Sequence, residues 1–145
     1  MATTTATITL SSADILSQAI SFSETMTLYK DNTTATGLDQ LNYHRAVIPT
    51  GGDFDLIPES AALSEDASYV YIKNHQTDVS HYITISINAE VIGNLYAGDW
   101  MFFPWDCDLT HATADSSVEV IAIGSAATIE YALFHNGETL PTSGD

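Results

Sequence analysis

Alternation of apolar and polar residues is the feature that most restricts how this chain can fold. In the segment AISFSETMTLYK, residues of one parity are apolar except for Glu24, namely Ile20, Phe22, Met26 and Leu28. The intervening residues from 21 to 27 are all Ser or Thr. A strand with one face in a core and the other in water has this period of two, so the segment predicts a half-buried strand.

The same pattern recurs along the chain. It predicts ten strands, at Thr5–Leu10, Ala19–Tyr29, Tyr43–Ile48, Phe54–Ile57, Tyr69–Asn74, Tyr82–Ile87, Val91–Tyr96, Trp100–Phe103, Val118–Ile123 and Thr128–Phe134. Gly, Asn and Asp in YKDNTTATG, IPTGGD, KNHQTD, YAGD and FHNGE supply the tight turns between them. Many short strands with turn signals predict an all-β fold, an antiparallel β-sandwich that is jelly-roll-like, with an immunoglobulin-like sandwich as the alternative.

The length of 145 residues predicts one domain, residues 1–145, with a core of its own. Only SADILSQAI, at Ser12–Ile20, has the signals of a short helix, and a turn between strands explains it equally well. The two ends, MATTT and NGETLPTSGD, are polar. They are interpreted either as frayed termini or as the arms of an assembly subunit.

The chain is strongly acidic, with 19 Asp and Glu against three basic residues and a formal net charge of −16. Lys30, Arg45 and Lys73 stand singly, whereas phosphate backbones are bound by clustered basic residues. Nucleic acid and anionic membranes are therefore not expected as partners. The N-terminus lacks the features of a signal peptide and no window of eighteen residues is apolar, so we expect a soluble protein made in a cytoplasm.

No segment has a pattern typical of catalysis or of metal binding. The five histidines, His44, His75, His81, His111 and His135, stand singly. The one cysteine, Cys107, lies between Asp106 and Asp108, which favour the protonated thiol, and these acids lack the spacing of a calcium loop. AIGSAA lacks the full Gly-x-Ser-x-Gly of a nucleophile elbow. We therefore expect a protein that is not an enzyme and has no cofactor or metal.

Bulky aromatic residues cluster in two of the predicted strands. They form a candidate interface of Tyr69, Tyr71, Trp100, Phe102, Phe103 and Trp105. Trp100 and Phe102 share one face of their strand, whereas Phe103 and Trp105 share the other face. Packing in the core or at a subunit interface, where aromatic residues are enriched, is favoured over a platform for carbohydrate.

Three segments, YVYIKNH, ITISINAEVIGNLYAGDWMFFPW and ATIEYALFH, resemble a pattern in small structural proteins of tailed bacteriophages. The shared features are a strand ending in Lys-Asn, a strand pair, a Gly-Asp turn before an aromatic-Pro strand, and a last strand with an acid, Tyr and Phe. The resemblance covers Ser68–His135, about half of the chain.

The resemblance implies a virion component without enzymatic activity, most simply a capsid decoration (cement) protein. Such proteins often form homotrimers on the outer shell, contact the major capsid protein and bridge capsomers. A net charge of −16 suits the capsid exterior better than a surface facing DNA. The alternatives are a tail or head-tail structural protein and a carbohydrate-binding β-sandwich module.

Overall fold

The computed structural model describes residues 4–14, 19–29, 37–38, 40–57, 68–87, 89–105 and 117–135. These residues form ten strands, β1 Thr4–Ser12, β2 Ile20–Leu28, β3 Gln40–Ile48, β4 Phe54–Ile57, β5 Ser68–Asn74, β6 Tyr82–Ile87, β7 Glu90–Tyr96, β8 Trp100–Trp105, β9 Val118–Ile123 and β10 Ala127–His135. The predicted all-β class is confirmed, and each predicted strand has its counterpart. The described part of the chain contains no helix, and so no helix long and apolar enough to cross a membrane.

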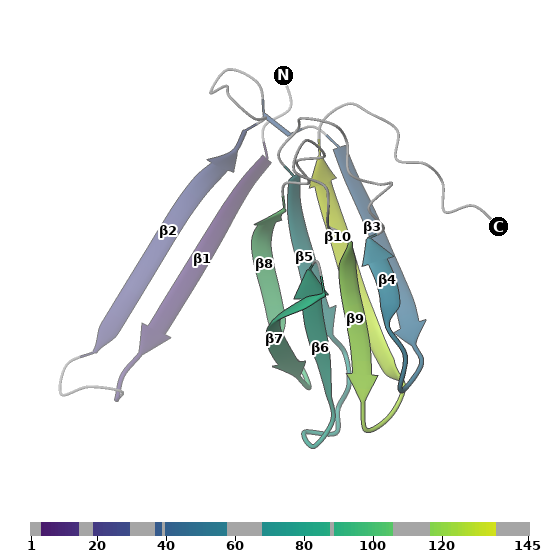
Figure 1. Ribbon diagram of the computed structural model, residues 1–145. Coiled ribbons are helices and arrows are strands. Elements are labelled where there is room, and N and C mark those ends of the chain that lie inside the picture. The colour runs from purple at the N-terminus through teal and green to yellow at the C-terminus, as the bar shows by residue number, and fades with distance from the viewer. Residues whose placement is uncertain are drawn as a thin grey trace.

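Eight of the strands build an antiparallel β-sandwich (Figure 1). One sheet has the order β3-β10-β5-β8 and the other has the order β4-β9-β6-β7. Within them β3 pairs with β10, β4 with β9, β5 with β8 and β6 with β7, so that the pairs are nested about the β6–β7 hairpin. This order is compatible with the predicted jelly-roll-like arrangement, in which a long hairpin is rolled into two sheets.

Apolar side chains of alternate positions fill the space between the two sheets. The fully buried members of this core include Ile48, Val70, Ile72, Ile83, Ile85, Val118, Val120 and Ile129. Ile83 and Ile85 come from the one apolar face that the alternation in β6 predicts, whereas Val118 and Val120 show the same period in β9. Burial of these branched side chains is the main force that holds the sheets together.

Asn74, at the end of β5, is a polar residue with no exposed surface inside this apolar layer. Its Nδ2 donates to the main-chain oxygen of Leu95 in the opposite sheet at 3.0 Å, and its Oδ1 accepts from the Gln76 amide at 2.9 Å. Its main-chain atoms pair with Gly98 and Asp99 in the turn between β7 and β8. The predicted YAGD turn is therefore present, and Asn74 connects it to both sheets.

The hairpin of β1 and β2 stands apart from the sandwich, and we call it the arm (Figure 1). Within the described strands, β1 and β2 pair only with each other. The base of the arm is the end at which Thr4 pairs with Leu28. Two hydrogen bonds fix this base: Thr4 Oγ1 donates to the Leu38 oxygen at 2.8 Å, and the Leu38 amide donates to the Leu28 oxygen at 3.0 Å. Leu28 and Leu38 are buried, whereas most of the arm beyond them is exposed.

The two strands of the arm were expected to be half-buried, and in the single chain their apolar face is exposed instead. The alternation correctly gives the strands and their two faces, but within the described part of the chain no second sheet lies over the apolar face of the arm. Residues 15–18, the middle of the predicted helix or turn at Ser12–Ile20, lie outside the described residues, as do the terminal residues 1–3 and 136–145.

Candidate functional site

The outer surface of the β3-β10-β5-β8 sheet is unusually rich in aromatic residues. Strand pairing places the outward residues in rows across the sheet, and we call two of these rows the outer aromatic face. Its residues are Leu41, Phe134, Tyr69 and Pro104 in the first row, and Tyr43, Ala132, Tyr71 and Phe102 in the second. Outward sheet positions in contact with water are usually polar, so this face has the composition of an interface rather than of a free surface.

The aromatic side chains of this face contact one another. The rings of Tyr69 and Phe102 stack with centroids 5.4 Å apart, and Phe102 meets Phe134 edge to face at 6.0 Å. Tyr71 lies 6.4 Å from Trp100 in the next row. Tyr43 and Trp100 are 55% and 52% exposed, so the cluster is preformed but open to a partner.

The structure divides the predicted interface residues between two surfaces. Tyr69, Tyr71, Trp100 and Phe102 lie on the outward side of their sheet, and Trp100 and Phe102 share a face as their spacing predicts. Phe103 packs against the core and Trp105 is 4% exposed within it. An interface role for the four outward residues remains a prediction, and the two inward residues contribute to the sandwich core.

A charged row follows the two aromatic rows. Strand pairing places Arg45 of β3, Glu130 of β10 and Lys73 of β5 side by side, next to Trp100. A hydrogen bond from His75 at 2.8 Å and the hydroxyl of Tyr43 lower the pKa of Glu130. Glu130 forms its ion pair with His75 and not with Arg45 or Lys73, the basic residues beside it in this described row. Two of the three basic residues of the chain therefore stand beside the outer aromatic face.

The outer surface of the other sheet has a different composition. Thr84 Oγ1 donates to Asn94 Oδ1 at 2.9 Å, and Ser86 Oγ lies 3.5 Å from the Glu119 carboxylate. The aromatic contact on this side is the pair of Tyr82 and Tyr96 at 5.2 Å. This outer surface thus combines hydroxyl, amide and carboxylate groups with the Tyr82–Tyr96 pair and the exposed Ile123, whereas the outer aromatic face has its rings in two adjacent rows.

The arm has two faces that differ even more sharply. Cross-strand pairs place Ala6 opposite Met26, Ile8 opposite Glu24, Leu10 opposite Phe22, and Ser12 opposite Ile20 on one face. On the other face, the residues of odd number in both strands, 5–11 in β1 and 21–27 in β2, are all Ser or Thr. The cross-strand pairs Thr7–Thr25 and Thr9–Ser23 are joined by hydrogen bonds of 2.8 and 3.1 Å. An isolated two-stranded hairpin is only marginally stable in water. The apolar face of the arm therefore has the properties of a surface that a partner covers.

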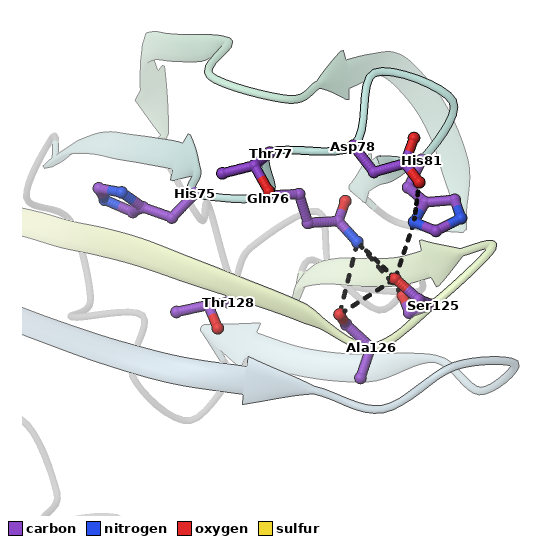
Figure 2. A pocket seen from close by; sticks show the side chains of 8 residues that line it. All are labelled: His75, Gln76, Thr77, Asp78, His81, Ser125, Ala126 and Thr128. Atoms are coloured by element: carbon purple, nitrogen blue, oxygen red, sulfur yellow. Dashed lines mark hydrogen bonds and ion pairs between the residues drawn. The ribbon is translucent and has the colours of Figure 1, made fainter.

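A polar pocket of about 250 Å³ lies between the loop after β5 and the turn between β9 and β10 (Figure 2). Ser125 Oγ is 2.9 Å from His81 Nδ1, and Asp78 Oδ2 is 3.8 Å from the same nitrogen. In a catalytic triad the acid binds the nitrogen opposite the serine, which the described geometry does not provide. Gln76 Nε2 also donates to Ser125 Oγ at 3.2 Å, so the group is better explained as a network that fastens the loop to the turn.

The remaining sequence candidates do not come together as a site. Within the described ranges, no three His, Cys, Asp or Glu side chains form a group that could hold a metal ion. His44 stacks on Tyr131 with centroids 5.4 Å apart, and Asn42 bonds to His135 at 3.0 Å. Cys107 and His111, with both neighbouring acids of the cysteine, lie outside the described residues.

Sequence reasoning did not identify the arm or the residues of β3 and β10 that complete the outer aromatic face. A signal for the arm was present, because one parity of both strands is Ser or Thr without exception while the strands contain a single charge, Glu24. For Tyr43 and Phe134 no local signal exists, since the pairing that brings them to Tyr69 and Phe102 joins distant segments.

The chain matches no model of a protein family, and neither the curated proteins nor the solved structures include one with significant similarity to it.

Proposed function

We propose that this protein is a non-enzymatic structural subunit that joins a larger assembly through exposed β surfaces. The observation that supports this most strongly is the presence, on one chain, of an arm with an uncovered apolar face and of a sheet with an aromatic outer face. Large exposed apolar surfaces are typical of sites that bind other proteins. The network around Ser125 and His81 offers no arrangement of groups for nucleophilic catalysis.

The specific proposal is a capsid decoration protein on the exterior of a tailed-phage virion, made in the host cytoplasm and bound to the major capsid protein. It rests on the resemblance of Ser68–His135 to small structural proteins of tailed phages and on the net charge of −16. Jelly rolls occur in viral capsid and lectin domains, which is a fold-level analogy. A position in the tail or at the head-tail junction would use the same surfaces.

The direct test is to mix the purified protein with capsids that lack it and to image the particles by cryo-electron microscopy. We expect ordered density at regular positions on the outer shell. Tyr71→Lys places a charge in the middle of the outer aromatic face and should abolish this density. Thr84→Lys is the matched control, because Thr84 occupies a central strand of the opposite sheet and points outward. Bare shells with the unaltered protein, or equal losses with both variants, would count against the proposal.

Carbohydrate binding is the second candidate, favoured by the side chain of Trp100. It is 52% exposed and lies 6.4 Å from the Tyr71 ring, an arrangement on which a sugar ring can stack. However, Asp99, the nearest acid in sequence, already accepts a hydrogen bond from the Tyr96 amide at 3.0 Å. Binding on a glycan array that disappears with Trp100→Ala would favour this candidate over the assembly role.

A further inference from the structure

We propose that the apolar face of the arm packs on the outer aromatic face of a second copy of this chain, so that copies exchange arms. This inference rests on the proposed role of the arm as an association surface, but not on the assignment to a virion. Three observations favour a second copy as the occupant: the charges on the two surfaces, the order of their rows, and the area that they offer.

The charges are complementary. Glu24 is the single ionisable residue in the two strands of the arm, and it lies on the apolar face opposite Ile8. Arg45 and Lys73 lie on either side of Glu130 in the charged row that borders the outer aromatic face, and Glu130 is already paired with His75, which leaves both basic residues available to Glu24. A buried carboxylate must be paired, so an arm that covers its apolar face needs a basic partner for Glu24. With only three basic residues in the chain, two of them at this position make the outer sheet face a suitable partner.

The order of the rows also agrees. Toward the tip of the arm, Glu24 is followed by the pair Leu10–Phe22 and then by Ile20. On the sheet, the charged row is followed by the row of Tyr71 and then by the row of Tyr69. Successive rows are about 7 Å apart in both, since each step covers two residues of a strand. When Glu24 lies over the charged row, the apolar tip of the arm therefore covers the aromatic rows, at the distance of about 10 Å typical of stacked sheets.

The available area favours exchange over a one-way contact. A hairpin with two strands of nine residues is about 30 Å long and about 10 Å wide, so one arm covers a footprint of roughly 300 Å². Stable complexes bury about 800 Å² of accessible surface on each partner. A copy that both gives and receives an arm buries twice this footprint. The solvent-accessible surface of the same patch is larger than its flat footprint, because side chains make the surface uneven. Reciprocal exchange in a dimer thus approaches the required area, because both arms lie in one interface, whereas a single arm does not.

The test uses a charge swap between two full-length variants. In Glu24→Lys the arm should repel the basic residues of a second copy, and in Arg45→Glu/Lys73→Glu the sheet should repel Glu24. Each variant alone should show a dissociation constant for self-association raised at least about tenfold, because like charges at an interface are strongly unfavourable. The mixture should regain association, since both of its arm contacts are complementary. The matched control is Glu90→Lys, the same charge change at an exposed residue of β7, which should associate at least as well as the unaltered protein.

Sedimentation velocity at about 0.15 M salt measures the association, where screening limits the repulsion between acidic copies. Circular dichroism checks that each variant is folded. Phe22→Ser provides a second arm variant that leaves the sandwich core intact, and it should also weaken association. An unaltered protein that stays monomeric, or a mixture that does not regain association, would overturn the inference. A monomer that still decorates capsids would overturn arm exchange alone, whereas an arm-exchanged oligomer that ignores capsids would overturn the virion assignment alone.

Discussion

Asn74 offers a stringent test of how the two sheets are held together. Replacement by Ala removes the donor to the Leu95 oxygen, which costs about 1–3 kcal/mol when the acceptor stays buried. Loss of packing around a side chain with no exposed surface adds roughly 1 kcal/mol. We therefore expect Asn74→Ala to lower the free energy of unfolding by about 2–4 kcal/mol, which corresponds to a fall in Tm of roughly 10 °C for a domain of this size.

Asn74→Asp tests the same contact through pH. The new carboxyl group would face the Leu95 oxygen and Gln76 Oε1 without a proton to donate when ionised. Its pKa in the folded protein should therefore lie above the value of about 3.9 in the unfolded chain. Protonation then favours the folded state. The variant should therefore be most stable below the unfolded pKa of about 3.9 and should lose stability as the pH rises through the raised pKa of the folded protein.

Urea denaturation followed by circular dichroism measures both variants, at pH 4 and at pH 7. Asn94→Ala is the control, since Asn94 is exposed on the outside of the other sheet, where its side chain accepts one hydrogen bond from Thr84. It should change stability by less than about 1 kcal/mol. The reasoning is refuted if Asn74→Ala is no less stable than Asn94→Ala, or if Asn74→Asp is equally stable relative to the unaltered protein at both pH values.

Three further predictions concern other parts of the molecule. Hydrogen bonds from His75 and Tyr43 lower the pKa of Glu130. The contribution of Glu130 to stability is therefore present above its unfolded pKa of about 4.3 and is lost as the pH falls through the lowered pKa. In urea titrations at a series of acidic pH values, Glu130→Gln should reduce this loss of stability with falling pH, and an unchanged loss would contradict the prediction. Gly124 has a φ of 92°, and a Cβ there would meet the His81 ring. Gly124→Ala should therefore destabilise the protein by about 1–3 kcal/mol and shift the His81 signals in NMR spectra. Gly52→Ala is the control, because a Cβ at Gly52 has open space around it, and it should do neither. Ser125 should resist a fluorophosphonate probe, because its neighbours do not form a triad; stoichiometric labelling that disappears with His81→Ala would show that the network is catalytic after all.

Much of the fold could be predicted because its signals are local. The alternation in β6 places Ile83 and Ile85 on one face, and that face is buried wherever a second sheet exists to cover it. The turn at Gly98 and Asp99 was likewise readable from its residues. The order of the strands in the sheets could not be predicted in this way. The first strand of the sandwich, β3, pairs with the last, β10, and no local sequence pattern indicates this pairing.

The candidate site could be predicted only in part for the same reason. Trp100 and Phe102 were assigned to one face by their spacing alone, and the structure places them there. The alternation in β2 showed that one face is apolar but not what covers it, so an arm and a core strand have the same sequence pattern. The charged row depends on the pairing of Arg45, Glu130 and Lys73 from three strands, which only the assembled sheet reveals.

Hydrogen exchange of the arm amides, measured over a range of protein concentrations, tests most directly whether the arm is covered in an assembly. The strands β5, β6 and β10, which lie inside the sandwich sheets, supply internal reference signals that should stay protected throughout. We expect β1 and β2 to exchange rapidly at low concentration and to become protected as copies associate, since their apolar face is then buried. Arm exchange that stays equally fast at every concentration, while sedimentation shows an oligomer, would contradict the central role of the arm.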